Sequence, residues 1–178
     1  MKLKVKTNKN NYSIIIGKNL FSKIHKIILN ERIYSQKFLL VYDSKVPAQM
    51  IKSIVSRFRK NEIEKKKIVF NEKSKNLKTV SSIVKILEKK NFSRNDSLIS
   101  VGGGICGDVC GFASSIFKRG LNFINVPTTL LSQVDSAIGG KTGINSLSGK
   151  NMIGSFYQPS LVISDIDFLK SLPKREMI

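Results

Sequence analysis

A glycine-rich stretch, residues 98–112, holds the residue types best suited to binding a phosphate group. Five of its residues are glycine, and eleven of the chain's 12 glycines fall between Gly102 and Gly154. Gly102, Gly104 and Gly107 satisfy the pattern G-x-G-x-x-G directly after an apolar run. Where this pattern joins a strand to a helix, the backbone approaches a pyrophosphate and the first N–H groups of the helix bind it. The stretch therefore predicts a dinucleotide site, with a tight packing turn as the alternative.

The acidic residue that normally binds the ribose of a dinucleotide is missing from its usual place. About 20 residues after the glycines, the chain reads Asn125-Val126-Pro127. An acid occurs earlier instead, because Asp43 ends the apolar run KFLLVYD. Asp43 is thus the candidate for the ribose hydroxyl, while a helix cap or turn residue is the alternative interpretation.

Two lysines follow glycines in a part of the chain that is poor in lysine. Lys141 and Lys150 are two of only five lysines in residues 101–178. The string DSAIGGKTG ends as a P-loop does, but Asp135 stands where a P-loop requires glycine, which argues against a nucleotide triphosphatase. We expect both lysines to bind anions, with solvated loop lysines as the alternative.

Strand-like and helix-like segments alternate before and after the glycines. The expected strands are residues 2–7, 12–17, 37–43, 66–70 and 96–101, and the expected helices are residues 19–29, 48–60, 76–91 and 108–117. The first two strands flank a polar turn and predict a hairpin. The remaining alternation predicts βαβ units, and hence a Rossmann-like α/β fold with a mainly parallel sheet and helices on both faces.

Composition excludes several classes of protein. Residues 1–100 carry a net charge of +17, spread over their expected helices and loops without interleaved aromatic residues, so we expect no nucleic-acid partner. No apolar run approaches the roughly 20 residues of a membrane span, and no signal peptide is recognisable. Cys106 and Cys110 are four residues apart, too constrained to pair, and are expected to be buried and reduced. These features together predict a cytoplasmic protein.

Four long strings resemble the 3-dehydroquinate synthase family: GGGICGD, GFASSIFKRG, NVPTTLLSQVDSAIGGKTGIN and GKNMIGSFYQPSLVISD. The resemblance implies conversion of 3-deoxy-D-arabino-heptulosonate 7-phosphate, a phosphorylated sugar acid, to 3-dehydroquinate and phosphate. It also implies bound NAD that is reduced and reoxidised within the cycle, a divalent metal (zinc or cobalt) and a homodimer.

The resemblance assigns roles to individual residues. Contact with NAD is implied for Asp43, Glu72, Lys75, Gly104, Ile105, Cys106, Gly107, Asp108, Thr128, Thr129, Lys141, Lys150, Phe168, Leu169, Lys170 and Ser171. Catalytic or substrate contacts are implied for Asp135, Lys141, Asn151 and Arg119, with Arg119 reaching a phosphate across the dimer interface. Two simpler interpretations stay open, because the threonines could cap a helix and Asp135 could be a surface residue of that helix.

Members of this family are roughly twice as long as the present chain. Their second, helical domain supplies the metal ligands, so no residue here is assigned to the metal. We expect residues 1–172 to form the NAD-binding domain and residues 173–178 to begin the helical domain. Four accounts remain open: part of a complete synthase, an NAD-binding module without catalysis, an inactive remnant, or another sugar-phosphate cyclase.

Overall fold

The computed structural model describes residues 1–7, 11–59 and 62–173. Its strands are β1 (Lys2–Val5), β2 (Tyr12–Gly17), β3 (Phe38–Asp43), β4 (Ile63–Ile68), β5 (Ser97–Gly102), β6 (Asn122–Pro127), β7 (Lys141–Ile144), β8 (Ile153–Phe156) and β9 (Leu161–Asp165). Its α-helices are α1 (Ile24–Asn30), α2 (Ala48–Val55), α3 (Leu77–Lys89) and α4 (Gly104–Ile116). Shorter helical turns are η1 (Phe21–Lys23), η2 (Glu72–Ser74), η3 (Phe117–Arg119), the π-helix η4 (Ser132–Ser136) and η5 (Ile166–Ser171).

Seven strands form one sheet in the order β1-β2-β9-β6-β5-β3-β4. The hairpin β1–β2 is antiparallel, and every other neighbouring pair in this sheet is parallel. The predicted Rossmann-like fold with an N-terminal hairpin is therefore confirmed. Central strand β5 is buried along its whole length, as expected for a strand with helices on both faces.

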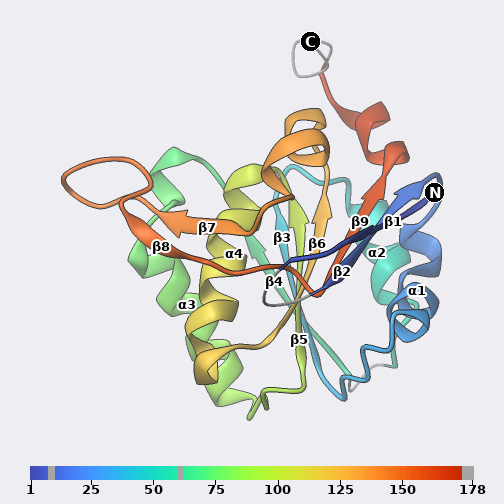
Figure 1. Ribbon diagram of the computed structural model, residues 1–178, viewed down its shortest axis with the longest axis horizontal. Coiled ribbons are helices and arrows are strands. Elements are labelled where there is room, and N and C mark those ends of the chain that lie inside the picture. The colour runs from blue at the N-terminus through green and yellow to red at the C-terminus, as the bar shows by residue number, and fades with distance from the viewer. Residues whose placement is uncertain (8–10, 60–61, 174–178) are drawn as a thin grey trace.

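Alternate residues of the strands face two separate apolar layers. Phe38 and Leu40 pack with the buried side chains of α1 and α2, whereas Leu39 and Val41 pack with those of α3 and α4. Figure 1 shows the sheet with α3 and α4 on the left and α1 and α2 on the right. Because side chains alternate along a strand, one apolar run such as FLLV supplies both layers.

Several predicted boundaries were wrong. Helix α4 begins at Gly104, four residues before the predicted start. Strand β4 covers residues 63–68 rather than 66–70, and α2 ends at Val55 rather than at residue 60. The predicted helix over residues 19–29 is instead the short turn η1 followed by α1. In each case the type of element is right and its end is misplaced, because hydrophobic periodicity locates the ends of helices and strands poorly.

A second, two-stranded sheet was not predicted. Strands β7 and β8 pair antiparallel, and β7 packs against α4 (Figure 1). Thr142 in β7 donates a hydrogen bond from its hydroxyl to the Ser155 carbonyl in β8, at 2.9 Å. This hairpin brings the loop of residues 145–152 over the start of α4, where it completes part of the site described below.

The predicted second domain cannot be compared with the structure over most of its length, because residues 174–178 lie outside the described residues. Within the described ranges, no helix combines the length and apolar character needed to cross a bilayer. Cys106 and Cys110 are both buried and unpaired, as predicted.

Candidate functional site

The sheet contains a point where neighbouring strands send their helices to opposite faces. Strands β3 and β5 are parallel neighbours. After β3 the chain enters α2 on one face, and after β5 it enters α4 on the other. Such a divergence opens a crevice beyond the carboxyl ends of the strands, where ligands of open α/β sheets bind.

A cavity of about 550 Å³ occupies this crevice and is called the first cavity here. Its lining includes eight of the residues predicted to bind NAD: Asp43, Gly104, Ile105, Cys106, Thr128, Thr129, Phe168 and Ser171. They come from the ends of β3, β5, β6 and β9 and from the start of α4. Segments far apart in the sequence thus meet at one edge of the sheet.

The structure bears out the interpretation of Asp43 as a turn residue, and its role toward a ribose stays a prediction. Asp43 is 8% exposed, and its Oδ1 accepts hydrogen bonds from the Ser44 hydroxyl and the Lys45 backbone N–H, at 3.3 and 3.1 Å. It therefore shapes the turn after β3. Its Oδ2 accepts no hydrogen bond from the described part of the chain and remains available to a ligand hydroxyl.

The first two glycines of the pattern are required by packing within the protein. A Cβ on Gly102 would lie 2.6 Å from the Cβ of Cys106, and one on Gly104 would lie 2.8 Å from the Ser136 Oγ. The packing-turn interpretation is therefore correct for both positions. The same close packing brings the start of α4 to the cavity wall, and no side chain caps it. Among the described residues its first N–H groups have no side-chain partner, and Gly104, Ile105 and Cys106 line the cavity, which suits an anion.

The two threonines after β6 differ. The Thr129 side chain caps the following helical segment, because its Oγ1 lies 2.8 Å from the Ser132 Oγ and accepts the Ser132 backbone N–H at 3.3 Å. The capping interpretation thus holds for Thr129. The Thr128 hydroxyl has no such partner among the described residues, so Thr128 is the better placed of the two to bind a ligand.

A second cavity, of about 650 Å³, lies beyond the first turn of α4. Asp135, Lys141 and Asn151, all predicted to act in catalysis, line it together with Asp108. Asp135 and Lys141 are exposed and carry no ion pair within the described ranges. Asp135 lies in the π-helix η4, an irregularity that is frequent at functional sites.

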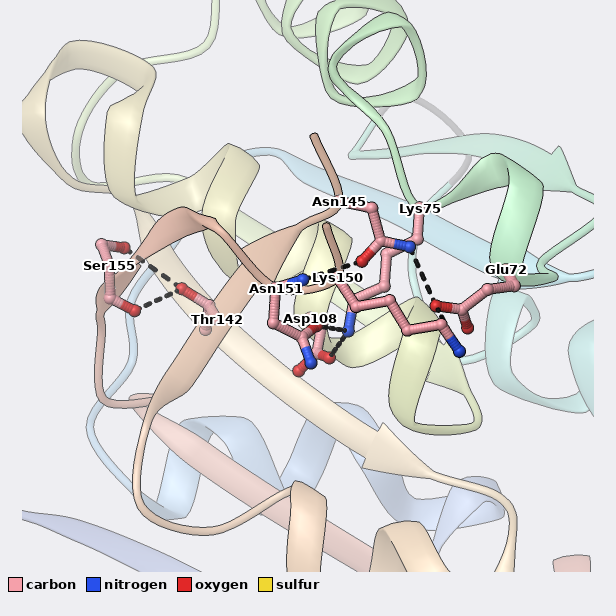
Figure 2. Close-up of polar contacts among 8 residues, drawn as sticks. All are labelled: Glu72, Lys75, Asp108, Thr142, Asn145, Lys150, Asn151 and Ser155. Atoms are coloured by element: carbon pink, nitrogen blue, oxygen red, sulfur yellow. Dashed lines mark hydrogen bonds and ion pairs between the residues drawn. The ribbon is translucent and has the colours of Figure 1, made fainter. Parts of the chain in front are cut away.

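Lys75 joins α4 to the loop between β7 and β8. Its Nζ donates to the Asp108 Oδ2 and to the Asn151 Oδ1, both at 2.5 Å, and the residue is only 6% exposed (Figure 2). Burial raises the pKa of Asp108, and the Lys75 ammonium opposes that rise without cancelling it. Asn151 adopts a left-handed backbone with φ of 56°, which asparagine tolerates better than most residues. We call these three residues the Lys75 cluster.

An exposed group lies beside this cluster (Figure 2). The Glu72 carboxylate accepts a hydrogen bond from Asn145 at 2.9 Å and lies 3.7 Å from the Lys150 ammonium. The Asn145 amide lowers the pKa of Glu72, and the charges of Lys150 and Lys75 lower it further. Asn145 was not predicted; its side chain also accepts the Asn151 backbone N–H at 2.9 Å, so it holds this loop in place. No sequence signal indicated it, because the strand before it, β7, was not predicted either.

Four predicted residues lie away from these contacts. Gly107 lines neither cavity, and a Cβ on it would lie 3.2 Å from the Asn125 side chain. Arg119 is exposed beyond the far end of α4, which at 1.5 Å per residue is roughly 20 Å from Gly104. Lys170 is exposed and paired with Asp167 at 2.7 Å. The side chain of Leu169 does not line either cavity. The described residues contain no cluster of three His, Cys, Asp or Glu side chains that could hold a metal ion.

Comparison with known proteins gives consistent matches. The family model described as 3-dehydroquinate synthase N-terminal matches residues 49–178. A 3-dehydroquinate synthase from Pelagibacter ubique is 57% identical over 178 residues, which cover 100% of this chain and 48% of that protein. One from Alkaliphilus metalliredigens is 44% identical, and the match covers 99% of this chain and 49% of that protein. The chain thus spans about half the length of the curated relatives that it matches.

Among solved structures, 2-deoxy-scyllo-inosose synthase complexed with carbaglucose-6-phosphate, NAD⁺ and Co²⁺ has a TM-score of 0.89 at 26% identity. That match covers 99% of this chain and 48% of the other. Because the family model matches residues 49–178, well over half of the chain, the chain belongs to the 3-dehydroquinate synthase family.

Proposed function

We propose that this chain is the NAD-binding part of a 3-dehydroquinate synthase. The observation that carries the proposal is the pair of cavities on either side of the first turn of α4. The first cavity has the groups that a dinucleotide needs, and the second gathers Asp135, Lys141 and Asn151, three of the four residues predicted to act on the substrate. Greater identity to 3-dehydroquinate synthases than to the inosose synthase favours this reaction over that of a related cyclase.

The first cavity fits NAD by its donors and acceptors. The N–H groups at the start of α4 would bind the pyrophosphate, and the free Oδ2 of Asp43 would accept a ribose hydroxyl. The Thr128 hydroxyl, which has no hydrogen-bond partner among the described residues, would donate to the bound dinucleotide. When bound, NAD supplies hydride acceptance and return. The described residues present no donor set for a metal, so the proposal assigns none to them.

The second cavity fits a substrate that carries hydroxyl groups and negative charge. Asp135 can accept from hydroxyls, and the Lys141 ammonium can bind an anionic group. The Asn151 amide is held in place by Lys75 and presents its remaining N–H donors to the cavity. Gly104 and Asp108 are about 6 Å apart along α4, so ligands in the two cavities would lie close enough to react.

The whole reaction is proposed for the complete protein. It would convert 3-deoxy-D-arabino-heptulosonate 7-phosphate to 3-dehydroquinate and phosphate, in a homodimer in which Arg119 reaches the substrate phosphate of the partner. For the present chain alone we propose NAD binding without turnover. Formation of dehydroquinate by the purified chain with NAD and zinc would contradict that part of the proposal.

Calorimetric titration of NAD tests the site directly. We expect Asp43→Asn to weaken NAD binding about tenfold, since a hydrogen bond to a charged group is lost. We also expect a smaller preference for NAD over NADP, because the carboxylate that repels a 2′-phosphate is gone. Glu88→Gln removes an exposed carboxylate from α3 and is the matched control. Equal NAD affinity of a folded Asp43→Asn variant and the control would overturn the assignment.

A further inference from the structure

A third hollow lies on the other side of the β3–α2 connection. It has a volume of about 620 Å³ and lies between α2 and the edge strand β4. Lys45, Val46 and Pro47 line both this hollow and the first cavity, so a single turn of chain separates the two. We call it the lysine groove, because four of its lining residues are Lys45, Lys52, Lys65 and Lys67.

The four lysines come from three different elements. Lys65 and Lys67 project from β4 on the same face as the buried Ile63, which packs with α2. Lys52 lies on α2, and Lys45 lies in the turn after β3. All four side chains are exposed, and the groove has no acidic residue in its lining. Within the described ranges none of the four forms an ion pair.

The opposite face of the same strand is arranged differently. Glu64 points to that face and pairs with Lys90 at 2.6 Å. The sequence alternation of β4 therefore places Lys65 and Lys67 on the groove side and Glu64, together with Lys66, on the other. Lysines on an edge strand discourage pairing with another chain, and this protective role explains Lys65 and Lys67. The same role does not explain Lys52 and Lys45, because they belong to a helix and a turn.

The floor of the groove is partly apolar. Tyr42 of β3 is the direct neighbour of Lys67 and is half-buried. Ile51 and Val55 of α2 line the same apolar part of the groove, called its apolar wall. Four ammonium groups around one hollow repel one another, and a multivalent anion relieves that repulsion at several lysines at once.

We propose that the lysine groove binds a polyphosphate chain, either as inorganic polyphosphate or as the phosphate tail of a nucleotide. Lysine is a point-charge donor that adapts to phosphate oxygens without a fixed geometry. Without a carboxylate in the groove, no internal anion competes for the ammonium groups. This site is separate from the proposed dinucleotide site, because Lys52, Lys65 and Lys67 do not line the first cavity.

The test is calorimetric titration with sodium tripolyphosphate, and in parallel with ATP, in the presence of excess NAD. We expect Lys65→Gln/Lys67→Gln to weaken tripolyphosphate binding about tenfold, in line with the loss of two exposed ion pairs. The matched control is Lys85→Gln/Lys89→Gln, which removes two exposed lysines from α3 on the opposite face of the sheet. The affinity of this control should equal that of the unmodified chain.

The remaining outcomes also decide the question. Tighter binding of ATP than of tripolyphosphate would show that the nucleoside uses the apolar wall, whereas equal binding identifies the phosphate chain alone as the ligand. If the edge-strand variant aggregates, Lys52→Gln on α2 tests the same groove and should weaken binding about threefold. No binding of tripolyphosphate, or an equal loss in the α3 control, would overturn the proposal.

Discussion

Replacement of Lys75 by methionine removes the ammonium from the Lys75 cluster and keeps a long side chain in its place. The Asp108 carboxylate would then be partly buried without a counter-charge and would face the Asn151 carbonyl oxygen. Removing one partner of a buried ion pair costs about 3–5 kcal/mol of folding free energy. Because the Asp108 side chain is 22% exposed, water offsets part of the loss, and we expect about 3 kcal/mol at neutral pH.

The matched control is Lys90→Met. Lys90 lies 2.6 Å from Glu64, a distance similar to that between Lys75 and Asp108, but the two side chains are 47% and 43% exposed. Exposed pairs contribute at most about 1 kcal/mol. The same substitution at two equally short ion pairs therefore isolates the effect of burial. Urea unfolding followed by circular dichroism measures both, and about 3 kcal/mol corresponds to a midpoint shift of roughly 1.5 M.

The pH dependence supplies an independent check. Burial raises the pKa of Asp108 in the folded protein, so protonation of this carboxyl favours folding. This contribution to folding stability is fully present below about pH 3.9, the pKa of the carboxyl in the unfolded chain. It is lost as the pH rises through the higher pKa of Asp108 in the folded protein. Lys75→Met raises the folded pKa further, so its cost should be small near pH 4 and largest at neutral pH. Equal, pH-independent costs for the Lys75 and Lys90 variants would refute the reasoning.

Three further predictions concern packing. Gly104→Ala should lower stability by about 1–3 kcal/mol, because its methyl would crowd the Ser136 hydroxyl, and Ser136→Ala should restore part of the loss in urea unfolding. Phe168→Ala should cost about 3–5 kcal/mol by the same measurement, since its fully buried ring packs in the core. Cys106 and Cys110 should resist a thiol reagent until the protein unfolds, because both are buried and burial raises the pKa of Cys106; rapid labelling of the folded chain would contradict this.

The sequence predicted two of the most buried strands, although β9, which is equally buried, is absent from the expected strands. The run KFLLVYD became β3, and DSLISV became β5, because strands covered on both faces are continuously apolar. The start of α4 was misplaced because glycine has a low helix propensity and predicts a later beginning. Packing overrides that propensity here, since Gly104 has no room for a side chain against Ser136. The strands β7 and β8 were missed because each has only four residues and contains a glycine.

For the site, the sequence identified the residue types and missed their partners. Lys75 is separated from Asp108 by 33 residues and from Asn151 by 76, so no local pattern indicates that the three side chains meet. Asn145 was missed for the same reason. Asp43 was predictable, because its position at the end of a buried strand places it at the carboxyl edge of any parallel sheet.

The contacts of the Lys75 cluster bear on how the two cavities depend on each other. Lys75 holds the loop between β7 and β8 twice, since its carbonyl accepts the Asn145 N–H at 2.8 Å and its ammonium binds Asn151. The walls of the first cavity come instead from the ends of β3, β5, β6 and β9 and from the start of α4. Loss of the Lys75 ammonium should therefore disorder the second cavity and leave the first largely intact. Persistent NAD binding by Lys75→Met, together with weaker protection of the Asn145 amide against hydrogen exchange, would show that the first cavity forms independently of the loop that completes the second.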